Sequence, residues 1–91
     1  MEEILKELNK INKLKVNQAF YRVSPHIRSL DIKLYRKKYK DNMKMSTVLK
    51  VDFAEDFETP SKITINETSG SFTSTTISYN KLIKILESYE G

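Results

Sequence analysis

Residues 31–40 read Asp-Ile-Lys-Leu-Tyr-Arg-Lys-Lys-Tyr-Lys, and their apolar and polar side chains alternate along the chain. In an extended chain the aliphatic residues point to one side, whereas Lys33 and Tyr35 point to the other. After turn-forming residues, a second alternating stretch follows at 46–54. The two stretches therefore predict an antiparallel hairpin over about 31–54, with one buried face and one wet face.

The remaining segments predict two helices and a second hairpin around this one. Aliphatic residues recur at a spacing of three and four after residue 2, and the same spacing returns at about 80–89. Between them, a β-branched run broken by a Ser-Gly turn predicts a hairpin over about 61–78. We expect an α+β fold of a single small domain, 1–91, in the order α-β-β-β-β-α. Its four-stranded antiparallel sheet would carry the helices packed on one face.

The segment 16–23 is open to two interpretations. Its apolar residues continue the spacing of the first helix, but Ala19 and Tyr21 also occupy alternate positions, as in a strand. Pro25 disfavours a helical conformation for the residue before it, so a helix would have to end near that point. We favour a long first helix over about 2–23.

Composition excludes several kinds of site. The 91 residues contain no cysteine, one histidine and two glycines. This removes disulfides, thiolate zinc sites, cysteine nucleophiles and glycine-rich phosphate loops. We predict no catalytic residues, no metal site and no cofactor, and therefore not an enzyme. No apolar run approaches the ~20 residues that span a bilayer, so we expect no membrane association and a cytoplasmic protein.

Charge is distributed unevenly along the chain. The net charge is +4, but residues 1–50 hold thirteen Lys and Arg against five Asp and Glu, whereas residues 51–91 hold three against seven. The surface is therefore expected to be polarised rather than uniformly basic. A polarised surface favours recognition of a complementary protein over uniform attraction to phosphates.

Two candidate contact sites follow from this distribution. The partner-binding residues would be Lys33, Tyr35, Arg36, Lys37, Lys38, Tyr39, Lys40 and Lys44. A secondary acidic contact would comprise Asp52, Glu55, Asp56 and Glu58. Cations separated by aromatic rings suit phosphates and stacked bases, but they equally suit a protein contact or a solvated strand that resists aggregation. The acidic residues could meet a basic partner surface or the basic half of a second copy in a homodimer.

The function we expect is a non-enzymatic protein-binding module that acts by stoichiometric docking. In size, charge pattern and lack of a cofactor motif, the chain resembles, as a class, the short phage inhibitors of restriction or CRISPR machinery. It shares no motif with them. Abundant lysine, asparagine and isoleucine fit an AT-rich phage or mobile element, which implies a bacterial host cytoplasm. The alternative is an RNA or single-stranded DNA binding protein that uses the basic, tyrosine-interleaved hairpin.

Overall fold

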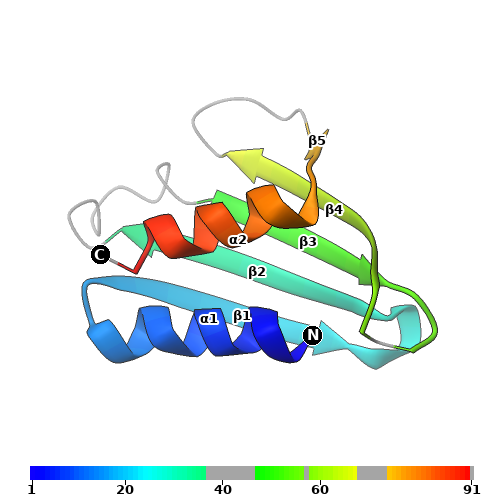
Figure 1. Ribbon diagram of the computed structural model, residues 1–91, viewed down its shortest axis with the longest axis horizontal. Helices are drawn as coiled ribbons and strands as arrows, with labels where there is room; N and C mark the ends of the chain where they lie inside the picture. The colour runs from blue at the N-terminus through cyan, green and yellow to red at the C-terminus, as the bar shows by residue number, and fades with distance from the viewer. Residues whose placement is uncertain (37–46, 57, 68–73, 91) are drawn as a thin grey trace.

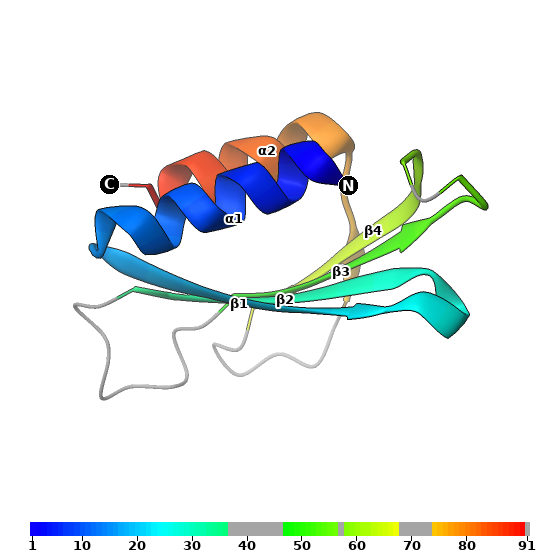
Figure 2. The ribbon, with the colours of Figure 1, turned by 90° about the horizontal axis from the view of Figure 1, so that it is seen from below.

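A computed structural model describes residues 1–36, 47–56, 58–67 and 74–90 (Figure 1). In chain order the elements are α1 (Glu2–Leu14), β1 (Asn17–Ser24), the 3-10 turn η1 (Pro25–Ile27), β2 (Ser29–Arg36), β3 (Thr47–Phe53), β4 (Pro60–Glu67), β5 (Thr75–Thr76) and α2 (Tyr79–Ser88). The strands form one antiparallel sheet in the order β1-β2-β3-β4-β5. Both helices lie on the same face of this sheet (Figure 2). The expected α+β class, antiparallel sheet and one-sided helix layer are confirmed, although the sheet has five strands rather than four.

The expectation of a first helix that runs to residue 23 is wrong. The helix α1 ends at Leu14, and the next residue, Lys15, adopts a left-handed conformation with φ 59°. The chain then returns as β1, which pairs with β2 from Asn17 opposite Arg36 to Ser24 opposite Ser29. The backbone of β1 forms hydrogen bonds with the side of β2 that would otherwise lack a neighbouring strand. A helical continuation of α1 could not form these bonds.

The described strands of the two predicted hairpins pair as expected and the last helix is present, whereas residues 37–46 and 68–73, which connect these strands, lie outside the described residues. The strands β2 and β3 pair in antiparallel fashion, as do β4 and β5. The helix α2 begins directly after Ser78. The Ser78 hydroxyl caps the helix, because it accepts a hydrogen bond from the Lys81 backbone N–H at 3.2 Å. Its end at Ser88 lies one residue before the predicted end.

One hydrophobic core fills the space between the helices and the sheet. Its buried aliphatic residues include Ile4, Leu8 and Ile11 from α1, Leu82 and Leu86 from α2, and Leu30, Ile32, Leu34, Leu49, Val51 and Ile63 from the sheet. The sheet residues among them occupy alternate positions of their strands, so the residues between them point to the other side. No helix or strand of the described residues lies on that other side, which leaves it open for contact (Figure 2).

Candidate functional site

The surface opposite the helices, named here the open face, is built from alternate residues of neighbouring strands. It comprises Gln18, Phe20 and Arg22 of β1, Asp31, Lys33 and Tyr35 of β2, Val48, Lys50 and Asp52 of β3, and Lys62 and Thr64 of β4. Because cross-strand partners share a face, the pairing register brings these residues together from separate parts of the chain. The open face is thus assembled by the fold rather than by one stretch of sequence.

Opposite charges lie across from each other on the open face. Asp31 stands between Arg22 on β1 and Lys50 on β3, and Asp52 stands opposite Lys62 on β4. Opposite charges at such cross-strand positions stabilise a sheet by about 0.2 to 1 kcal/mol per pair. The same arrangement places carboxylates among the cations, so the open face is not a uniformly basic track for phosphates.

An exposed aromatic side chain borders a shallow hollow on the open face. The side chain of Phe20 is 56% exposed, and its ring packs edge-on against Tyr35 with the ring centroids 5.7 Å apart. The hollow has a volume of ≈ 430 Å³ and is lined by Phe20, Tyr21, Arg22, Asp31, Ile32, Lys33 and Val48. The hollow thus combines apolar walls with a charged rim, and its size suits one apolar or aromatic side chain.

The predicted basic site is only partly assembled by the described residues. Lys33 and Tyr35 share the open face, as the alternation predicts. Arg36 lies on the helix side instead, where its guanidinium sits 4.1 Å from the centre of the Tyr89 ring and donates to the Ser88 carbonyl at 3.4 Å. It therefore fastens the end of α2 to β2. Of the other predicted residues, Lys37, Lys38, Tyr39, Lys40 and Lys44 lie outside the described residues.

The predicted acidic residues do not form one contact surface. Asp52 belongs to the open face, opposite Lys62. The Asp56 carboxylate accepts hydrogen bonds from the backbone N–H groups of Glu58 and Thr59 and from the Thr59 hydroxyl, at 2.9 to 3.0 Å. These bonds, from Thr59 above all, lower the pKa of Asp56 and hold the β3–β4 connection. Glu55 and Glu58 are exposed in that connection, away from the hollow.

Sequence reasoning missed the β1 and β3 residues that border the hollow. The expected helix over about 2–23 includes Phe20 and Arg22, so it does not place these residues beside Lys33 on a sheet. The signal that could have found them was the alternation within 16–23, which fits a strand as well as a helix. For Val48 the sequence predicts a place in the second strand of the hairpin but no role in a site.

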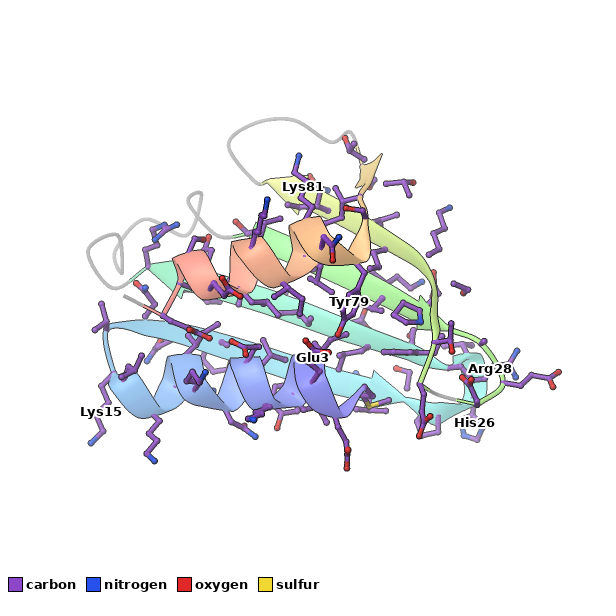
Figure 3. All side chains as sticks on the ribbon, in the orientation of Figure 1. Glu3, Lys15, His26, Arg28, Tyr79 and Lys81 are labelled. Atoms are coloured by element: carbon purple, nitrogen blue, oxygen red, sulfur yellow. The ribbon has the colours of Figure 1, made fainter. Side chains whose placement is uncertain are left out.

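On the helix side of the sheet, a hydrogen bond between Tyr79 and Glu3 links the N-terminal ends of α2 and α1. The Tyr79 hydroxyl donates to the Glu3 carboxylate at 2.8 Å, and Figure 3 shows the two side chains pointing toward each other from α2 and α1. Partial burial, together with this bond and the charge of Glu3, raises the pKa of Tyr79 to about 12. The contact therefore persists across the neutral range and serves the packing of the two helices.

A second contact between the helices joins two carboxyl groups. Glu7 on α1 faces Glu90, which follows α2; the Glu7 Oε2 and Glu90 Oε1 atoms are buried and receive no hydrogen bond from another described residue. A hydrogen bond with Glu7, followed by burial, raises the pKa of Glu90. Folding thus favours the protonated form of Glu90 more than a free glutamate would, and ionisation of Glu90 beside Glu7 costs stability.

The replacement Glu90→Gln is expected to raise the free energy of unfolding at pH 7. The amide can donate to Glu7 without carrying a second negative charge. In the parent, the stability contributed by the protonated carboxyl is present below the ordinary glutamate pKa and is lost as the pH rises through the raised pKa. The advantage of the variant should therefore disappear near pH 4. Urea unfolding at both pH values measures this. The exposed loop variant Glu55→Gln serves as control, and an equal gain in both variants would contradict a destabilising contact between Glu7 and an ionised Glu90.

Within the described residues, no group of three or more His, Asp or Glu side chains could hold a metal ion. No helix among them is long and apolar enough to cross a membrane. Comparisons with protein-family models, curated proteins and solved structures found no match to this chain. The functional interpretation therefore rests on the geometry of the open face.

Proposed function

We propose that this chain is a non-enzymatic protein-binding module that docks stoichiometrically through the β1–β3 part of its open face. The observation that carries the proposal is the exposed Phe20 ring beside the ≈ 430 Å³ hollow. Leaving a large aromatic side chain in water forgoes the ~1.5 to 3 kcal/mol that its burial provides. Aromatic side chains next to pockets with charged rims are the typical anchors of protein interfaces.

The charges of the open face favour a protein partner over a nucleic acid. Asp31 and Asp52 stand among the cations and would repel a phosphate backbone laid across the sheet. A protein partner can place its own cations opposite these carboxylates and its own carboxylates opposite Lys33. Lys33 and the Phe20–Tyr35 ring pair do support the second candidate, single-stranded RNA or DNA, because rings beside a cation can stack on bases.

The class of target that we propose is a host-defence or nucleic-acid-processing protein, inhibited because docking covers its functional surface. The small size, the polarised charge and the abundance of lysine, asparagine and isoleucine, which is typical of AT-rich genomes, support this choice. Binding of this kind would be anti-restriction or anti-CRISPR in type and would require equal amounts of the two proteins.

The variant Phe20→Ala is expected to weaken binding to the protein target by about 30-fold or more, the usual effect of removing a central aromatic anchor. To test this, the tagged full chain is expressed in the host that carries its gene and the bound partner is recovered. Titration of the purified pair then measures the affinity. Leu14→Ala is the matched control, because Leu14 is 50% exposed but lies on α1 rather than on the open face.

Recovery of nucleic acid alone would contradict the protein-binding proposal. In that case the affinity should fall linearly with the logarithm of salt concentration, and Lys33→Glu should weaken it strongly. If the Phe20→Ala and Leu14→Ala variants instead bound a protein partner with equal affinity, the contact would lie outside the hollow.

A further inference from the structure

Strand β1 forms one edge of the sheet, and part of its outer backbone is unpaired. The Asn12 side chain on α1 accepts a hydrogen bond from the Ala19 N–H and donates to the Ala19 carbonyl, both at 2.9 Å. These two backbone groups therefore point away from β2. Because direction alternates along a strand and β1 pairs with β2 without a bulge, the N–H and C=O groups of Tyr21 and Val23 also point outward. No hydrogen bond from another described residue reaches them.

The surroundings of Tyr21 and Val23 leave this edge accessible. β1 continues past the N-terminal end of α1 (Figure 1), and the edge faces the viewer in Figure 2 with no described element in front of it. The Tyr21 and Val23 side chains are 40% and 37% exposed. Proteins usually shield such edges with short strands, bulges or proline. Here the opposite edge strand, β5, has two residues, whereas β1 has eight.

We propose that the β1 edge accepts an extended acidic segment of the protein partner as a sixth strand of the sheet. This inference rests on the proposed function and specifies how the partner is held. Backbone hydrogen bonds to Tyr21 and Val23 would supply affinity, and alternate side chains of the added strand would supply specificity. One set of these side chains would lie beside Phe20 and the hollow on the open face.

The charge around the edge sets the chemistry of the added strand. Between Glu7 and Asp31 the sequence contains no acidic residue. Arg22 projects from β1 to the open face, where Asp31 is its cross-strand partner, and Arg28 lies at the turn where β1 ends (Figure 3). An incoming strand with carboxylates at alternate positions complements these groups, whereas a basic strand would be repelled.

The same residues disfavour a second copy as the occupant of the edge. In a two-fold antiparallel pair, placing Tyr21 opposite the partner's Val23 puts Arg22 directly opposite its own symmetry mate. The neighbouring register, with Tyr21 opposite its mate, needs the Ala19 backbone groups that Asn12 already holds. Self-pairing therefore either brings like charges together or forms very few backbone hydrogen bonds.

The test uses two synthetic peptides with the full-length chain. In one peptide glutamate alternates with isoleucine, and in the other lysine replaces glutamate. We expect the acidic peptide to shift the NMR signals of the Tyr21 and Val23 amides and to slow their hydrogen exchange, while the basic peptide leaves both amides unchanged.

Two pairs of variants locate the contact. Val23→Pro removes an outward N–H and is expected to weaken binding of the acidic peptide by about five- to tenfold, whereas Val23→Ala keeps that N–H and most of the affinity. Circular dichroism verifies the fold of both. Arg22→Glu should transfer the preference to the basic peptide. Lys50→Glu is its matched control, because it also places a carboxylate opposite Asp31 but lies two strands from the edge.

Three results would overturn the inference. In the first, the Tyr21 and Val23 amides stay unprotected from hydrogen exchange at millimolar acidic peptide. In the second, the two peptides bind equally well. In the third, these amides are already protected in the free protein and the protein sediments as a dimer. None of them affects the Phe20 test of the proposed function. Conversely, if the peptide bound at the edge but no protein partner depended on Phe20, only the proposed function would be contradicted.

Discussion

Replacement of Tyr89 by alanine is expected to lower the free energy of unfolding by about 3 to 5 kcal/mol, the range for large aromatic residues removed from a core. Tyr89 is 4% exposed and follows α2 at the end of the described chain. Its hydroxyl lies 2.8 Å from the Thr47 hydroxyl, its carbonyl accepts a hydrogen bond from Asn17 at 2.7 Å, and Arg36 covers its ring. One residue thus joins α2 to β1, β2 and β3.

The conservative variant Tyr89→Phe separates the two contributions of this residue. It keeps the ring and its contact with Arg36 but removes the bond to Thr47, so we expect a loss of about 1 to 2 kcal/mol. Urea unfolding followed by circular dichroism measures both variants. A loss for Tyr89→Ala no greater than that for Tyr89→Phe would show that the ring adds nothing to the fold.

The replacement Leu34→Ala is expected to cost about 2 to 5 kcal/mol of stability, because it leaves a cavity in the core between the helices and the sheet. Leu34 is fully buried on β2, one strand in from the edge. Since small domains are stable by only about 5 to 15 kcal/mol, a considerable fraction of the variant should be unfolded at elevated temperature.

The control for Leu34→Ala is Val48→Ala, on the opposite face of the neighbouring strand. Val48 is only partly buried and lines the hollow, so its replacement should cost under about 1 kcal/mol of stability yet weaken partner binding. Thermal unfolding and partner titration of the two variants therefore give opposite patterns. Equal destabilisation would mean that the open face carries more of the folding energy than its exposure indicates.

The hollow and the open edge form one continuous candidate surface around β1. Phe20 points to the open face, while its neighbours Tyr21 and Val23 offer their outward backbone groups at the edge. A partner that adds a strand at the edge would bring its own side chains directly over the hollow. The proposed docking and the proposed strand addition can therefore reinforce each other in one complex.

Much of the fold was predictable because the relevant signals are local. The alternation in 31–36 identifies a half-buried strand, and the spacing after Ser78 identifies the last helix together with its cap. The same alternation correctly placed Lys33 and Tyr35 on one face. It could not show that Arg36 turns back to Tyr89, because that contact depends on where α2 comes to rest.

The sequence by itself determined the α+β class, the order of the hairpins and the wet side of β2, since each follows from side-chain periods within a few residues. Only the tertiary structure decided that residues 17–24 form a strand. Their local preference is divided between helix and strand, and the choice depends on distant groups: the backbone of β2, the Asn12 side chain and the Tyr89 carbonyl that Asn17 reaches across 72 positions. Because the candidate surface is built around this one strand, its location also followed from those long-range contacts.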